Sequence, residues 1–289
     1  MTSQWRDQLG RFGIWRPAVQ ATPDLAAGLE RLGFGALWLG GSPDADLEIV
    51  DQLLAATGTL IVGTSIVNIW KDEAAAVAIS WARIQAAYPG RFLLGVGAGH
   101  PEATAHYASP YDTLAGYVDQ LTDHGVPAAG IVLAALGPRV LRLAGDHTAG
   151  AIPYLVPPEH TRLAREILGP DRLLAPEHKV VLDADPAKAR ALGRRRVASP
   201  YLGLVNYTSN LRRLGFTDAD VNDGGSDRLV DALVAHGTVE QVAGQLHAHL
   251  DAGADHVCIQ LLTEGGTGAL AGYAELARGL GLPADGNLS

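Results

Sequence analysis

The chain has only one cysteine, Cys258, among its 289 residues. A single cysteine can neither close an internal disulfide nor supply a multi-cysteine metal site. Because Cys258 stands in an apolar stretch, we expect it to be an ordinary core residue. His247 and His249 also make a poor metal site, because helical residues two apart do not share a face. The sequence therefore predicts no metal.

Basic charge is also scarce. The chain has 22 lysines and arginines against 31 aspartates and glutamates, a formal net charge of −9. Binding to nucleic acid requires a basic footprint that neutralises phosphates, so we expect no nucleic-acid partner. The one basic run, Arg194, Arg195 and Arg196, falls in a predicted helix and is interpreted as a solvated face.

Long apolar runs are missing as well. No stretch reaches membrane-spanning length, and the first residues show no signal-peptide pattern, so a cytoplasmic protein is expected. Yet 47% of the residues are hydrophobic, enough for a large core. We see no linker, low-complexity tract or internal repeat and predict one domain over 1–289. The Ala-, Gly- and Arg-rich composition is compatible with a bacterial source.

Apolar strands alternate with amphipathic helices along the whole chain, the pattern of a parallel sheet with helical crossovers. The expected strands are 12–17, 36–41, 60–70, 92–99, 130–137, 149–156, 178–184 and 256–263. Eight strands, each followed by helix, predict an α/β fold of the (β/α)8 TIM-barrel type. Extra helical pieces over 185–236 predict a helical insertion between strands seven and eight.

The fourth expected strand runs into RFLLGVGAGHPE, residues 91–102. A dinucleotide-binding fingerprint needs G-x-G-x-x-G after a first strand, and this spacing and position fail that test. In a barrel these glycines would lie at the C-terminal mouth, where active sites are built. Bare backbone there admits a flat ring or a phosphate. The alternative is that the glycines form only a tight turn.

The third expected strand carries GTSIVNIW, residues 63–70. Thr64 and Ser65 are a polar pair in an otherwise apolar strand. Asn68 and Trp70, at its end, could hydrogen-bond and stack against a heterocycle. The alternative is a capped strand end with a buried tryptophan.

Together with LAALGPRVLRLAGDHTAGAIPYLV, YTSNLRRLGFTDAD and GGSDRLVDALVAHGT, these motifs resemble the luciferase-like monooxygenase superfamily. Within it they resemble the branch that uses the deazaflavin coenzyme F420. The resemblance implies a (β/α)8 barrel with the ring at its C-terminal mouth, an oxidoreductase acting on a small-molecule substrate, and a homodimer. FMN with monooxygenase chemistry is the alternative within the superfamily.

The resemblance also implies site residues. A non-prolyl cis peptide is expected at Ser65–Ile66, and Gly137 would open a helix whose N-terminal amides suit an anion. The implied cofactor-binding residues follow three strand ends: Ser65, Ile66, Asn68, Trp70, Ala98, Gly99, His100, Ala135, Leu136 and Gly137.

His100 is the candidate catalytic acid or base, because related enzymes place a proton-donating carboxylate in this loop. The alternative is that it only contacts the cofactor. Relatives commonly have an acidic residue and a histidine after strand two, where this chain has Gly40 and Gly41, which leave space in the substrate pocket. Trp15 and Tyr154 either line the substrate side or pack in the core.

Two further hypotheses remain open. A barrel aldolase or isomerase acting on phosphorylated sugars would need a lysine or carboxylate at a strand end. Neither Lys71 nor Lys179 is clearly placed inside the barrel mouth by its position in the sequence, and no partner is identifiable for His178 or Gln260. The last hypothesis is a non-catalytic relative that binds a flavin or deazaflavin.

Overall fold

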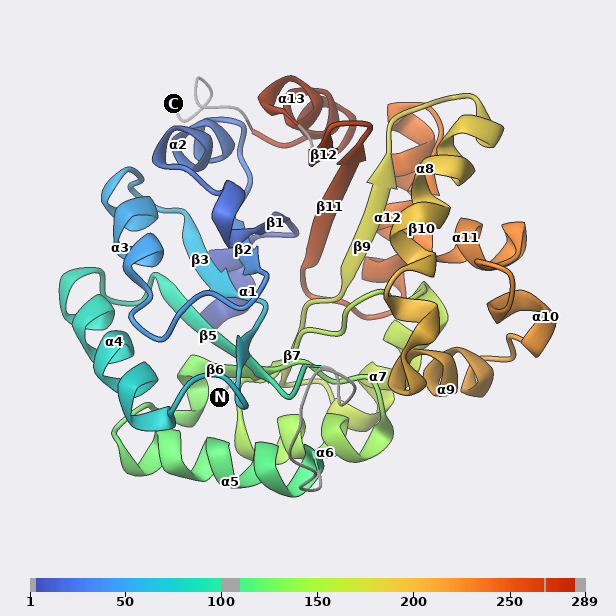
Figure 1. The fold of residues 1–289 in the computed structure, drawn as a ribbon. Coiled ribbons are helices and arrows are strands. Elements are labelled where there is room, and N and C mark those ends of the chain that lie inside the picture. The colour runs from blue at the N-terminus through green and yellow to red at the C-terminus, as the bar shows by residue number, and fades with distance from the viewer. Residues whose placement is uncertain (1–3, 100–109, 268, 284–289) are drawn as a thin grey trace.

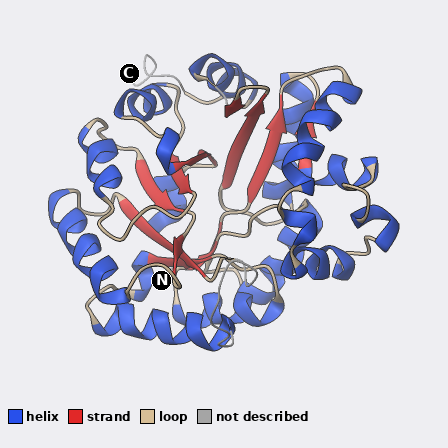
Figure 2. Cartoon of the chain, viewed as in Figure 1, coloured by secondary structure: helices blue, strands red, loops and turns tan. Residues whose placement is uncertain are grey.

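A curled sheet of mainly parallel strands forms the centre of the molecule, and helices pack around its outer side (Figure 1). The computed structural model describes residues 4–99, 110–267 and 269–283. Figure 2 shows the strands at the centre of the molecule and the helices around them. The architecture is α/β and is consistent with the predicted (β/α)8 barrel.

The strands pair in the order β10-β9-β11-β1-β2-β3-β5-β6-β7-β8, with β4 on β5 and an antiparallel β12 on β11. Their bounds are β1 Phe12–Pro17, β2 Ala36–Gly40, β3 Ile61–Thr64, β4 Val67–Asn68, β5 Phe92–Gly97, β6 Ile131–Leu133, β7 Gly150–Ala151, β8 Leu173–Leu174, β9 Glu177–Val181, β10 Val234–His236, β11 Val257–Thr263 and β12 Gly266–Thr267.

The helices are α1 Gln4–Leu9, α2 Pro23–Arg31, α3 Glu48–Ala55, α4 Ala74–Ala87, α5 Pro110–Asp123, α6 Pro138–His147, α7 Pro158–Leu168, α8 Pro186–Ala198, α9 Val205–Arg213, α10 Asp218–Val221, α11 Asp227–Leu233, α12 Val239–Asp251 and α13 Leu270–Gly279. Short 3-10 helices are η1 Ala18–Gln20, η3 Ala128–Gly130 and η4 Tyr201–Gly203. No helix in the described ranges is long and apolar enough to cross a membrane.

The segment that contains β8 and β9 joins the two ends of the curled sheet. On one side, the Ala175 N–H donates to Ala151 O and the Glu177 N–H donates to Pro153 O, both at 2.8–2.9 Å. On the other side, the Cys258 N–H donates to Pro176 O at 2.9 Å. The sheet therefore curls round until β7 and β11 both bond to one segment.

Sequence signals explain most of the helix boundaries. Thr22 caps α2 by accepting the Leu25 N–H, and Pro23 occupies the first helical position. Thr238 and Gln241 form the expected capping box at the start of α12. The expected cap by Asp72 is wrong, because α4 begins after Glu73 and has no side-chain cap.

Several expected strands are shorter than the apolar runs that predicted them. The run 60–70 divides into β3 and β4, and β6 and β7 cover only three and two residues of 130–137 and 149–156. In each case the chain leaves the sheet while it is still apolar, because the residues that follow line a cavity. The short helix α1 and the strands β8 and β10 were not predicted, because they show no clear periodic pattern of apolar residues.

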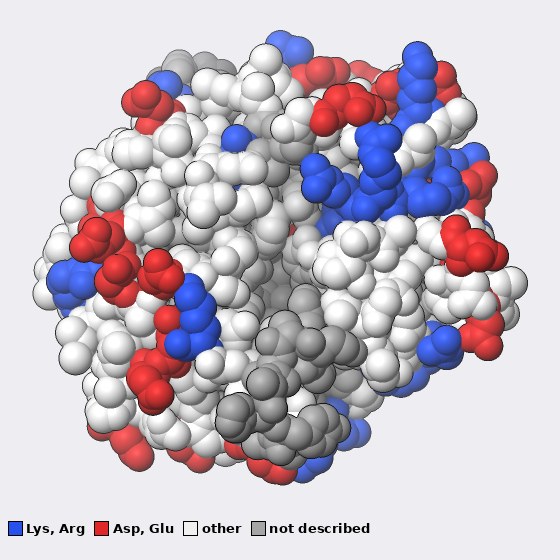
Figure 3. Space-filling view, viewed as in Figure 1, with Lys and Arg blue, Asp and Glu red and all other residues white. Residues whose placement is uncertain are grey.

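A separate cluster of buried residues stabilises the chain between β9 and β11, where α8 and α11 pack against the sheet. Arg194 and Arg195, from the basic run on α8, form ion pairs with Asp227 and Glu264. Figure 3 shows Lys and Arg gathered over this part of the molecule, beside acidic side chains. Helices α8 to α11 lie in the part of the chain, between β9 and β11, where the sequence predicted a helical insertion.

Candidate functional site

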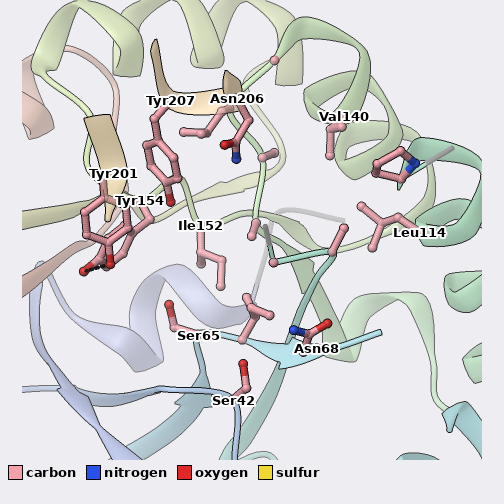
Figure 4. Close-up of a pocket in the computed structure, with 18 of the residues that line it drawn as sticks. Ser42, Ser65, Asn68, Leu114, Val140, Ile152, Tyr154, Tyr201, Asn206 and Tyr207 are labelled. Carbon is pink, nitrogen blue, oxygen red and sulfur yellow. Dashed lines mark hydrogen bonds between the residues drawn. The ribbon is translucent and has the colours of Figure 1, made fainter. Parts of the chain in front are cut away.

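A cavity of about 510 Å³ opens where the parallel strands end. Its described lining follows the C-terminal ends of β1, β2, β3, β5, β6 and β7, together with α5, η4 and α9 (Figure 4). The lining residues are Trp15, Gly41, Ser42, Ser65, Ile66, Asn68, Ala98, Gly99, Pro110, Tyr111, Leu114, Ala134, Ala135, Leu136, Gly137, Val140, Ile152, Tyr154, Tyr201, Asn206 and Tyr207.

The polar pair in the third strand has two different roles. Thr64 is fully buried, and its hydroxyl donates to Gly95 O and accepts the Gly95 N–H, both at 2.8 Å. It therefore continues the pairing of β3 with β5. Ser65 lines the cavity, and its Oγ accepts a hydrogen bond from Trp15 Nε1 at 3.0 Å. The Ser65–Ile66 peptide bond is cis, as predicted.

The glycines of the fourth expected strand have distinct tasks. A Cβ on Gly95 would stand 1.9 Å from Thr64 O, so this glycine allows the strands to approach closely. Gly97 faces Ile66 and Ala134, and a Cβ there would be 3.0 Å from the Ala134 side chain. Gly99 lines the cavity in a left-handed conformation with φ +58°. Close packing and a turn thus explain part of the motif, and only its last glycine faces the cavity.

Asn68 and Trp70 separate in the structure. Asn68 lines the cavity, and its Oδ1 accepts the Trp70 N–H at 3.0 Å. The Trp70 side chain packs against the hydrophobic core and is not part of the cavity lining. Of this predicted pair, only the asparagine faces the cavity.

The ends of β6 and β7 complete the wall. Ala135, Leu136 and Gly137 line the cavity, and Gly137 precedes α6 without a side-chain cap. Arg213 Nη2 lies 3.8 Å from the position that a Cβ on Gly137 would take. This edge of the cavity therefore brings the N–H groups at the start of α6 close to a guanidinium group.

Four aromatic rings form a continuous wall, which we call the aromatic wall: Trp15, Tyr154, Tyr201 and Tyr207. Successive ring centroids are 5.4, 5.4 and 4.9 Å apart, distances at which aromatic rings attract one another. Figure 4 shows the three tyrosines and Asn206 on one side of the cavity, with Ser65 and Asn68 opposite. Trp15 and Tyr154 were predicted; Tyr201 and Tyr207, from the region of the insertion, were not.

Gly40 is buried beneath this wall and is not among the lining residues, whereas Gly41 is. A Cβ on Gly40 would stand 1.9 Å from Trp15 Cζ2, so the indole fills the space that the glycine leaves.

Gly40→Ala is therefore expected to displace Trp15, break its hydrogen bond to Ser65 and cost about 1–3 kcal/mol of stability through overpacking. Chemical denaturation measures the loss. Gly203→Ala is the matched control, because nothing lies within 4 Å of its Cβ and it has no positive φ to oppose the change. A loss in Gly40→Ala no larger than that in Gly203→Ala would show that Trp15 does not occupy the space above Gly40.

A buried polar network lies behind the aromatic wall and was missed by sequence reasoning. Lys179 Nζ donates to Glu177 Oε1 at 3.1 Å and to Gln260 Oε1 and Tyr154 Oη, each at 2.8 Å. Tyr154 donates to Gln260 Oε1, and Tyr201 donates to Tyr154 Oη. The position of Lys179 in the sequence did not place it clearly inside the barrel mouth, and in the structure it lies behind Tyr154 and outside the cavity lining.

Burial dominates the electrostatics of this network. It lowers the pKa of Lys179 and raises the pKa values of Glu177 and Tyr154, while the ion pair between Lys179 and Glu177 opposes the first two shifts. The Lys179 side chain is 1% exposed and does not line the cavity. Its three donors are all used, so it is not placed to attack a substrate carbonyl.

A second buried cluster lies between β9, α7 and α12. His178 Nδ1 and His249 Nε2 are 2.9 Å apart, and His249 Nδ1 pairs with Thr161 Oγ1 at 2.8 Å. Among the described residues, no group of three or more His, Cys, Asp or Glu side chains is arranged to hold a metal ion. Cys258 is a buried free thiol in β11.

The candidate catalytic residue His100 lies outside the described residues. Of the other predicted site residues, Trp15, Gly41, Ser65, Ile66, Asn68, Ala98, Gly99, Ala135, Leu136, Gly137 and Tyr154 meet around one cavity, and Gly40 and Trp70 do not line it.

Residues 4–123 match the sequence model of the luciferase-like monooxygenase family, which confirms the predicted resemblance over that part of the chain. No curated protein sequence matches the chain.

Solved structures share the fold over nearly the whole chain. An F420-dependent secondary alcohol dehydrogenase, in complex with an F420–acetone adduct, has a TM-score of 0.72 at 15% identity and covers 97% of this chain and 99% of its own. The coenzyme F420 dependent tetrahydromethanopterin reductase of Methanopyrus kandleri has a TM-score of 0.63 at 14% identity, covering 93% and 97%.

An FMN-bound relative is similar to about the same degree. The oxygenating constituent of 3,6-diketocamphane monooxygenase from Pseudomonas putida, in complex with FMN, has a TM-score of 0.61 at 14% identity, covering 95% of this chain and 97% of its own. At these identities the likeness shows the fold, and both kinds of cofactor occur among the relatives.

Proposed function

We propose that this chain is a coenzyme F420-dependent oxidoreductase that transfers a hydride between the deazaflavin and a small organic substrate in the cavity. The observation that carries the proposal is the convergence of the predicted cofactor residues from three strand ends on one cavity. The fold likeness to two F420-dependent enzymes supports it.

The described lining fits a flat ring. Gly41 and Gly137 present bare backbone, and nothing lies within 4 Å of a Cβ on Gly41. Ala98, Ala134 and Ala135 add only methyl groups, so the wall beside the cis Ser65–Ile66 bond stays shallow. A planar ring system can lie against such a surface, with Asn68 at its edge.

We assign the anionic tail of the cofactor to the end of this shallow alanine and glycine surface where α6 begins. The N–H groups at the start of α6 would face a phosphate there, and the guanidinium of Arg213, whose Nη2 also donates to Asn210 Oδ1, lies beside them. When bound, the deazaflavin supplies two-electron hydride chemistry. The residues of the chain would position the ring, exclude water and hold the substrate against it.

The hydride-transfer step is tested by mixing F420-loaded protein with panels of alcohols, aldehydes and enones and following the loss or gain of oxidised F420 by absorbance. A stoichiometric change with at least one panel member is expected. F420 that binds but exchanges no hydride with any member would favour the non-catalytic relative.

His100→Ala is expected to lower turnover by about 100-fold or more if His100 moves the proton that accompanies hydride transfer. F420 affinity should change by less than about threefold, since proton transfer and binding are separate functions. Steady-state kinetics and fluorescence titration of the same variant measure both. Intact turnover with weakened F420 binding would instead make His100 a cofactor contact.

FMN with monooxygenase chemistry is the second candidate, and the fold likeness to an FMN-bound oxygenating constituent favours it specifically. The aldolase or isomerase hypothesis gains no support from Lys179, which is paired with Glu177 and bonded to the Tyr154 hydroxyl. The homodimer and the cytoplasmic location remain predictions from the family resemblance and the sequence.

A further inference from the structure

We propose that the substrate is an uncharged aromatic aldehyde or ketone that carries a hydroxyl group and binds against the aromatic wall. This inference rests on the proposed function and names the substrate class of the same cavity. Three independent features of the described lining support it: its charge, its rings and one unpartnered amide oxygen.

The first feature is the absence of charge. None of the described residues that line the cavity is Lys, Arg, His, Asp or Glu. The nearest buried cation, Lys179, lies behind Tyr154 and is neutralised by Glu177. A carboxylate or phosphate on the substrate side would be desolvated without a counter-charge, which is strongly unfavourable. Away from the edge near Arg213, the described lining therefore offers no counter-charge to an anionic substrate.

The second feature is the aromatic wall. Lys179 and Gln260 bond the Tyr154 hydroxyl, so Tyr154 presents its ring to the cavity rather than a free polar group. Trp15 and Tyr201 extend the ring surface on both sides of it. Rings that are held rigidly by packing and hydrogen bonds attract a flat π system more than a flexible aliphatic chain.

The third feature is Asn206, on α9. Its Oδ1 is buried and has no hydrogen-bond partner, and the residue lines the cavity beside Tyr207. A buried amide oxygen without a donor is destabilising, because no hydrogen bond offsets its desolvation. A substrate hydroxyl that donates to Asn206 Oδ1 would remove that cost. This single contact calls for one neutral donor group on the ligand.

The three tyrosines of the wall and Asn206 lie across the cavity from Ser65 and Asn68, on the side away from the proposed ring site (Figure 4). A ligand held there by its aromatic system would present its carbonyl carbon toward the cavity centre. A hydride from the reduced deazaflavin would form the new C–H bond at that carbon, and the carbonyl oxygen would take up one proton from solvent to give the alcohol.

The test is isothermal titration of three probes that share a naphthalene ring: acetonaphthone, a hydroxyacetonaphthone with its hydroxyl on the far ring, and the matching hydroxynaphthoate. Protein without cofactor and protein loaded with F420 are titrated separately. The hydroxyacetonaphthone is expected to bind at least 5-fold more tightly than acetonaphthone and at least 30-fold more tightly than hydroxynaphthoate.

Two variants assign the contacts. Asn206→Leu is expected to remove the advantage of the hydroxyl probe and leave acetonaphthone affinity within 2-fold. Tyr207→Leu is expected to weaken both neutral probes at least 5-fold, whereas Tyr207→Phe keeps the ring and the affinity for acetonaphthone. Gly203→Ala is the matched control, because a methyl group there meets nothing within 4 Å and the residue does not line the cavity.

Hydroxynaphthoate binding as tightly as the neutral probes would overturn the proposal, as would an absence of binding by all three to folded protein. Unchanged probe affinities in Asn206→Leu and Tyr207→Leu would place the ligand elsewhere and also overturn it. If neutral probes bind the protein but F420 does not, the cofactor assignment fails while the ligand class stands. If F420 binds and the probes do not, the proposed ligand class fails while the cofactor assignment stands.

Discussion

Lys179→Met is expected to destabilise the protein by about 3–5 kcal/mol, because it leaves the carboxylate of Glu177 buried without its ion-pair partner. The loss should shrink as the pH falls. Burial raises the folded-state pKa of Glu177 above its usual 4.5, and without Lys179 this rise becomes larger. The protonated carboxyl is tolerated in the core, whereas the ionised form is not. Denaturant unfolding of the variant at several pH values measures both effects.

Two further variants control this prediction. Lys188→Met removes a lysine whose side chain is 74% exposed and pairs only with nearby Asp185, so its effect should stay below about 1 kcal/mol. Adding Glu177→Gln to Lys179→Met removes the uncompensated charge and should restore more than half of the lost stability. A Lys179→Met variant as stable as the parent at neutral pH would contradict the buried ion pair.

Acid is expected to unfold the protein steeply between about pH 6.5 and 4. Burial lowers the pKa of both His178 and His256 to about 4, from an ordinary 6.5. A histidine with a depressed folded-state pKa contributes its stability above the unfolded pKa and loses it as the pH falls toward the folded value. One pKa unit is worth about 1.4 kcal/mol, so each of these two histidines removes about 3 kcal/mol by pH 4.

His256→Gln isolates one of these contributions. His256 Nε2 accepts a hydrogen bond from Trp38 Nε1 at 3.0 Å, and a glutamine oxygen can accept it without gaining a proton. Between pH 7 and pH 4 the free energy of unfolding of the variant should fall less than that of the parent. The difference should correspond to the uptake of roughly one proton fewer on unfolding. His124→Gln, at an exposed position, is the control and should keep the parent's pH dependence. An unchanged slope in His256→Gln would show that His256 is not buried as a neutral ring.

Local signals account for the parts of the fold that the sequence predicted well. The Thr22–Pro23 start of α2 and the Thr238 capping box of α12 depend only on neighbouring residues. Alternating apolar runs also located the parallel strands, although not where each strand ends. The chain leaves β6 at Leu133 and β7 at Ala151 because the next residues turn into the cavity, and hydrophobicity alone does not record that turn.

The site was only partly predictable for a related reason. Residues that directly follow strands, such as Ser65, Gly99 and Gly137, could be placed at the mouth from strand position and family resemblance. Tyr201 and Tyr207 come from helices far along the chain, and no periodic pattern links them to Trp15. Lys179 looked like the start of an apolar strand; the nearby carboxylate at Glu177, two residues away and therefore on the same strand face, was the signal that could have revealed it.

Parallel equilibrium titration of the purified protein with F420 and FMN, followed by the change in cofactor fluorescence, tests the central claim most directly. Arg213→Glu, which puts a negative charge beside Gly137, serves as the site-specific variant and Arg212→Glu, its exposed neighbour on α9, as the control. The account predicts F420 binding at least 10-fold tighter than FMN binding, weakened at least 5-fold by Arg213→Glu and little by Arg212→Glu. Tighter binding of FMN, or no binding of either cofactor, would contradict it.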